Sequence, residues 1–106
     1  MDIDSDRAEK ALNYLALTDM EIARLKAAVA ESEYVVDLRE RTHFLTASGN
    51  VEERKAFAKV QADVAQAHKA YFESIAAYEG VKARRERAVI TLDLFRTLEA
   101  SRRKGG

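Results

Sequence analysis

The residues of this sequence that are best suited to chemistry are arginines gathered in two short segments. Arg39 and Arg41 precede the aromatic Phe44. The second segment consists of Lys82, Arg84, Arg85 and Arg87. A guanidinium group matches the geometry of phosphate, and an exposed aromatic ring can stack on an unpaired base. We therefore consider both segments candidate nucleic-acid-binding sites.

Each segment also has a simpler interpretation. Cations near a helix C-terminus stabilise the helix dipole, which would explain Arg39 and Arg41. The second segment could be a solvated face or could pair with acidic residues of a neighbouring subunit. Residues 1–81 hold 10 Lys/Arg against 15 Asp/Glu, and residues 82–106 hold 8 against 3. Such a separation favours self-association or binding of the basic end to a polyanion.

No segment predicts catalysis. A hairpin folded at Gly49 would place His43 near residue 55, several turns from His68, so both histidines are expected to be structural or at the surface. The chain contains no cysteine, which excludes thiolate chemistry and zinc sites built on cysteine. It also lacks a glycine-rich phosphate loop. We expect no enzyme activity, no metal and no cofactor.

The elements that must position these residues are helices. Proline is absent, glycine occurs four times, and alanine, glutamate, arginine, lysine and leucine are abundant, a composition that favours helix. The strongest break is Ser48-Gly49-Asn50. Gly49 can adopt the left-handed conformation that ends a helix, and Asn50 with Glu53 has the spacing of an N-terminal cap. A turn is therefore predicted at residues 48–50.

A second helix start is predicted near residue 19. Thr18 and Glu21 have capping-box spacing, and Leu17 with Ile22 has the spacing of a hydrophobic staple. The predicted fold is all-α, a long antiparallel helical hairpin made of a short N-terminal helix and two long helices, coiled-coil-like and oligomeric. Its bounds are a frayed end at 1–5, one hairpin domain at 6–102 and a disordered tail at 103–106.

Apolar residues of the last helix recur at alternating steps of three and four, which predicts a heptad seam. The seam consists of Phe57, Val60, Val64, Ala67, Tyr71, Tyr78, Val81, Ala88, Leu92 and Phe95. Ser74 and Arg85 are its polar exceptions. Because a two-helix hairpin leaves part of such a seam uncovered, we expect a homo-oligomer with Tyr71, Tyr78, Leu92 and Phe95 at its interface.

The segment Arg39-Glu40-Arg41-Thr42-His43-Phe44, followed by Ser48-Gly49 and a long helix, resembles the UvsY-like recombination mediator family of bacteriophages. The resemblance covers about residues 20–100. It implies an accessory factor that binds single-stranded DNA and helps to load a recombinase onto strands covered by a single-strand-binding protein. It also implies that Arg39 and Arg41 contact the DNA backbone. The chain departs from the family pattern in its shorter length and its acidic N-terminus.

The expected function is thus a phage-type, homo-oligomeric single-stranded-DNA-binding mediator. Its expected partners are DNA, a recombinase and a single-strand-binding protein. The alternative is a helical adaptor, or a small phage inhibitor of a host complex, that binds protein and no nucleic acid. No apolar run approaches the roughly 18–20 residues of a membrane span, so no membrane contact is expected. The N-terminal residues are acidic, which is the wrong sign for a signal peptide or a presequence, so a cytoplasmic location is expected.

Overall fold

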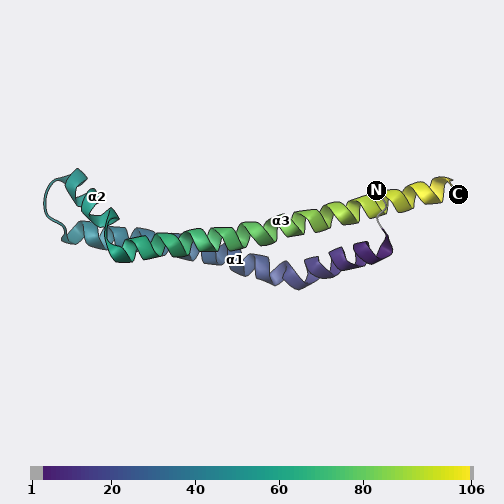
Figure 1. Cartoon of the computed structure of the whole chain (residues 1–106), viewed down its shortest axis with the longest axis horizontal. Coiled ribbons are helices and arrows are strands. Elements are labelled where there is room, and N and C mark those ends of the chain that lie inside the picture. The colour runs from purple at the N-terminus through teal and green to yellow at the C-terminus, as the bar shows by residue number, and fades with distance from the viewer. Residues whose placement is uncertain (1–3, 106) are drawn as a thin grey trace. The chain divides into compact units, whose positions relative to one another are not determined.

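The computed structural model describes residues 4–105, and these residues form three helices and no strand. Helix α1 runs over Ser5–Thr46, α2 over Val51–Lys59 and α3 over Ala62–Gly105 (Figure 1). The prediction of an all-α chain is confirmed. None of the helices in this part of the chain is long and apolar enough to cross a membrane.

The helices form two compact units. Unit 1 joins the start of α1, up to residue 23, to α3 from residue 79 onward, and unit 2 comprises residues 24–78. In unit 2, the hydrogen bonds Ser32–Ser74 and Glu40–His68 connect α1 to α3 in antiparallel order. In unit 1, Arg85 of α3 is bonded to Leu15 and to neighbouring residues of α1. Each unit therefore pairs one segment of each long helix.

The turn that closes the hairpin of unit 2 lies where the sequence predicts it. Gly49 has φ +106°, the left-handed region that glycine tolerates best. Asn50 is the N-cap of α2, and its side chain accepts a hydrogen bond from the Glu53 amide at 2.9 Å. Both features are local, so the residue types alone were sufficient to locate the turn.

The predicted helix start at residue 19 is wrong, because α1 continues through it. The Thr18 hydroxyl donates to the Tyr14 carbonyl at 2.7 Å instead of capping a new helix, and Thr18 is buried. The first cap is Asp4, whose carboxylate accepts from the Arg7 amide at 2.8 Å. Part of the predicted frayed end is thus ordered as a cap. Residues 1–3 lie outside the described residues.

A break that the sequence did not reveal separates α2 from α3. Val60 leaves helical geometry, and the Gln61 side chain donates to the Phe57 carbonyl at 2.9 Å, which satisfies a free carbonyl at the end of α2. Phe57 and Val60 consequently leave the predicted seam and are exposed. The break also shifts the register: Ser32 faces Ser74, where a hairpin folded at Gly49 would place residue 66.

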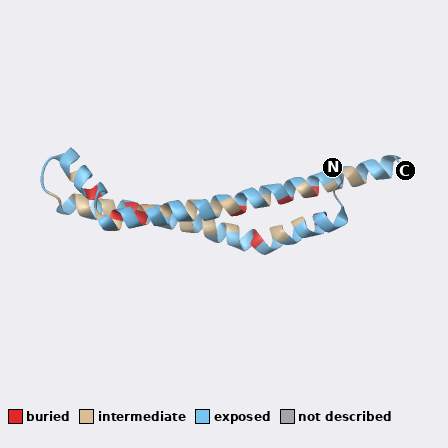
Figure 2. Cartoon of the chain, in the orientation of Figure 1, coloured by how far each residue is buried: buried red, intermediate tan, exposed pale blue. Residues whose placement is uncertain are grey.

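The buried positions are mostly small and lie along the facing sides of the helices (Figure 2). The buried apolar residues are Ala8, Val36, Ala58, Val64, Ala67, Val81, Ala88 and Leu92, and Thr18 is the one buried polar residue among those described. Alanine and valine let two helices approach closely, but they bury little apolar area per residue. Helix α3 passes through Gly80 without a break and continues to Gly105, so residues 103–105 are helical where a disordered tail was expected.

Candidate functional site

A basic groove lies in unit 1 between α1 and α3. It has a volume of about 510 Å³. Its lining residues are Arg7, Lys10, Ala11 and Tyr14 from α1, and Arg84, Arg87, Ala88 and Thr91 from α3. The described residues that line it thus include four cations and no carboxylate. Such a surface favours an extended anion, and the Tyr14 ring and the Thr91 hydroxyl add stacking and hydrogen-bonding capacity.

The cations of the basic groove are not used to hold the fold together. Among residues 4–105, no ion pair involves Arg7, Lys10, Arg84 or Arg87. Arg84 makes one bond within its own helix, from Nε to the Gly80 carbonyl at 3.2 Å. All four side chains are exposed, and their charges add along one groove.

Arg85, which the sequence grouped with Arg84 and Arg87, has a different role. One of its nitrogens donates to the Leu15 carbonyl at 2.8 Å and to the Thr18 hydroxyl at 2.7 Å, and the other lies 3.2 Å from an Asp19 oxygen. Arg85, one of the two polar exceptions in the heptad seam, therefore meets polar partners across the seam. Arg85 connects α1 to α3 in unit 1, and both of its terminal nitrogens have acceptors within its own chain. Lys82 is exposed beside it.

The three predicted side chains around residue 40 face different partners in the fold. Arg39 points inward and donates to the Asp63 carbonyl at 2.8 Å. Arg41 is exposed and pairs with Asp37 at 3.1 Å. Phe44 is half-buried, with the Arg54 guanidinium 4.3 Å from its ring centroid. The structure therefore does not bring Arg39, Arg41 and Phe44 together as one site.

Asp63 joins the end of α1 to the start of α3. Its carboxylate accepts from His43 Nε2 at 2.7 Å. Burial raises the pKa of Asp63. The hydrogen bond and charge of His43, the Val64 amide and the charge of Arg39 together lower it by more, so the pKa lies below its ordinary value of 3.8. Both predicted structural histidines thus connect helices, since His68 donates to Glu40 at 3.1 Å.

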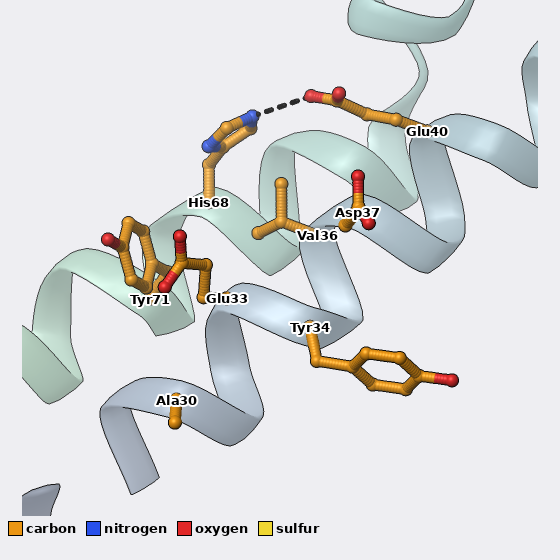
Figure 3. Close-up of a pocket in the computed structure, with 8 residues that line it drawn as sticks. All are labelled: Ala30, Glu33, Tyr34, Val36, Asp37, Glu40, His68 and Tyr71. Atoms are coloured by element: carbon orange, nitrogen blue, oxygen red, sulfur yellow. Dashed lines mark hydrogen bonds and ion pairs between the residues drawn. The ribbon is translucent and has the colours of Figure 1, made fainter.

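A second groove, the acidic groove, lies in unit 2 and has a volume of about 620 Å³ (Figure 3). Three carboxylates of α1 line it, Glu33, Asp37 and Glu40, together with His68 and Tyr71 of α3. Figure 3 shows these side chains on the two helices and the hydrogen bond between Glu40 of α1 and His68 of α3. The two grooves therefore have opposite charge.

The four residues predicted for an oligomer interface divide into two groups. Leu92 is buried inside unit 1, so it belongs to the seam within the chain. Tyr71, Tyr78 and Phe95 are half-buried and keep part of their surface accessible. Other apolar side chains are exposed to a greater fraction, among them Leu17 at 81%, Met20 at 77% and Leu45 at 74%.

Sequence reasoning missed the contribution of α1 to the basic groove. Arg7, Lys10 and Tyr14 have the spacing of one helix face, which was the available signal. The acidic residues around them concealed it, because they dominate the net charge of this segment. Only the pairing of α1 with α3 places these cations opposite Arg84 and Arg87.

Comparison with known protein families, with curated proteins and with solved structures found no significant match to this chain. Within residues 4–105, no group of three or more histidine, cysteine, aspartate or glutamate residues could hold a metal ion. The site therefore has to be interpreted from its own geometry, which is that of two open grooves of opposite charge.

Proposed function

We propose that this protein binds single-stranded DNA through the basic groove of unit 1. The observation that carries the proposal is the convergence of Arg7, Lys10, Arg84 and Arg87 on one groove whose described lining has no carboxylate. A cationic groove binds a nucleic-acid backbone by releasing its counterions. The four cations come from two helices and can follow both sides of one strand.

Tyr14 favours a single strand over a duplex. Its half-buried side chain lines the same groove as the cations. Aromatic rings beside a cationic track bind unpaired bases by stacking, and a paired base inside a duplex does not offer its face. The groove thus combines a backbone contact with a base contact.

The resemblance to UvsY-like mediators supports a function in recombination. In that role the protein would act as a homo-oligomer and help to load a recombinase onto strands covered by a single-strand-binding protein. We assign the DNA contact to Arg84 and Arg87 in place of Arg39, because the Arg39 guanidinium is bonded to Asp63. Arg41 is a secondary contact, since it is exposed but paired with Asp37.

Fluorescence anisotropy of a labelled single-stranded oligonucleotide tests the proposal, at about 50 mM and about 200 mM salt. We expect affinity to fall steeply with salt, and Arg84→Ala/Arg87→Ala to reduce the salt slope by about 2. Lys26→Ala/Lys69→Ala removes two exposed lysines of unit 2 and serves as the matched control. Equal affinity and slope for the two double variants would contradict the assignment.

A second candidate function is a helical adaptor, or a small phage inhibitor of a host complex, that binds protein alone. Exposed apolar side chains such as Leu17, Met20 and Leu45 favour it, because large exposed apolar surface marks protein interaction sites. Absence of oligonucleotide binding at both salt concentrations would favour this candidate over the first.

A further inference from the structure

We propose that copies of this chain associate head to tail, with the acidic groove of unit 2 in one copy docked on the basic groove of unit 1 in the next. One groove belongs to unit 1 and the other to unit 2, and the residues that line them carry opposite charge. The occupant of each groove is therefore a second copy of the same chain.

The acidic groove presents its carboxylates as one stripe on α1. Glu33, Asp37 and Glu40 are spaced by three and four residues and so lie on one helix face. Glu33 makes no ion pair among the described residues, Asp37 is paired with Arg41 and Glu40 with His68. Arg41 offsets part of this charge, but its side chain is 75% exposed and can turn away to solvent.

The basic groove matches this stripe in length and charge. Its α3 side extends from Arg84 to Thr91, and the acidic stripe extends from Glu33 to Glu40. Seven residues of helix span about 10 Å in each case. Three carboxylates would then face four cations that have no ion pair among residues 4–105 of their own chain. A helix of one copy laid along the groove of another is thus electrostatically complementary.

Apolar surface beside the stripe supplies area for the same contact. Tyr34 lines the acidic groove, is 64% exposed and points away from α3 in Figure 3. Leu38, on the same helix, is 50% exposed. Docking α1 of one copy against another would remove part of this surface from water.

The contact is heterologous, since the acidic groove of one copy binds the basic groove of the next and the two surfaces differ. Such contacts generate a closed ring or an open chain of copies. If the proposed function holds, single-stranded DNA occupies the same basic groove and competes with the next copy. This last consequence rests on the proposed function, whereas the association itself does not.

Sedimentation velocity of the full chain without nucleic acid tests the association, at about 50 mM and about 200 mM salt. We expect concentration-dependent association at the lower salt that weakens at the higher. Glu33→Lys/Asp37→Lys and Arg84→Glu/Arg87→Glu should each weaken it by about tenfold or more, because like charges then meet. A mixture of the two variants in equal amounts should associate again, because each supplies an intact groove for the other.

Several results would overturn the proposal. They are a monomeric wild type, association that neither charge reversal changes, and a mixture that fails to associate although circular dichroism shows both variants helical. Anisotropy of Glu33→Lys/Asp37→Lys with the oligonucleotide separates the two proposals. If this variant still binds DNA but no longer self-associates, both proposals are supported. If the wild type itself binds no DNA, the proposed function is contradicted and the association result is unaffected.

Discussion

Both units pair α1 with α3 in antiparallel order, but different polar groups form the hydrogen bonds between the two helices in each unit. Unit 1 relies on the guanidinium of Arg85, which reaches acceptors on Leu15, Thr18 and Asp19. Unit 2 distributes the task over the Ser32–Ser74 bond and two histidine–carboxylate pairs, His43–Asp63 and His68–Glu40.

The difference shows how a seam of small residues tolerates polar positions. Arginine is long and carries a fixed charge, so a single side chain can cross the seam and satisfy several acceptors. The shorter groups of unit 2 each reach one partner on the other long helix, and folding lowers the pKa of one of them, Asp63. The stability of unit 1 should therefore depend on Arg85, and the stability of unit 2 should depend on pH through Asp63.

The largest effect is expected from Arg85→Ala. It removes charged hydrogen bonds and leaves the buried Thr18 without its cross-helix donor, at a cost of about 1.5–3 kcal/mol in the free energy of unfolding. Hydrogen exchange should accelerate at residues 5–23 and remain unchanged at residues 24–78. Arg84→Ala is the matched control, because Arg84 bonds only within its own helix. Equal acceleration in both units would show that Arg85 does not act locally.

A smaller effect is expected from Gly49→Ala in the turn of unit 2. A methyl group at φ +106° is strained, and it would lie 2.6 Å from Glu53 Oε2. We expect a loss of about 1–2 kcal/mol in stability, measured by urea unfolding. Gly80→Ala in unit 1 is the opposite case, since its new methyl group meets only Arg84 at 3.6 Å within a helix. A gain of up to about 1 kcal/mol is expected there. Loss of stability in both variants would contradict this contrast.

The smallest effect is the pH dependence of unit 2. Folding lowers the pKa of Asp63, so the ionised carboxylate stabilises the folded state. This contribution to stability is fully present above about pH 3.8 and is lost as pH falls through the folded pKa. An NMR titration of the Asp63 carboxyl should give a midpoint below 3.8, and His43→Ala should raise that midpoint. A midpoint at or above 3.8 in wild type would contradict a stabilising role for the His43–Asp63 pair.

Residues whose role is local could be predicted, and residues whose partner is distant could not. Gly49 and Asn50 act on their immediate neighbours, so the turn was located from sequence. Thr18 has capping-box spacing, but Arg85, far away in the chain, binds its hydroxyl inside a continuous helix. The break at Val60 contains neither glycine nor proline, and it changed the register of the whole hairpin in unit 2.

The candidate site shows the same division. Arg84 and Arg87 were identified from sequence, and both line the basic groove. Arg85, directly between them, points into the seam instead. Adjacent helical residues face different directions, so a run of basic residues cannot all share one surface. Arg7 and Lys10 were missed because their groove exists only after α1 and α3 pair.

The sequence by itself determined that this chain is helical, that it turns at Gly49 and which side chains are charged. Helix propensity, the absence of proline and capping are properties of residues and their near neighbours. The tertiary structure decided which charges remain available. Residues 1–23 hold 2 Lys/Arg against 6 Asp/Glu, and residues 79–106 hold 8 against 4, so unit 1 is neutral although its two segments are not. Charge is a sum over neighbours in space, and only the fold assigns those neighbours.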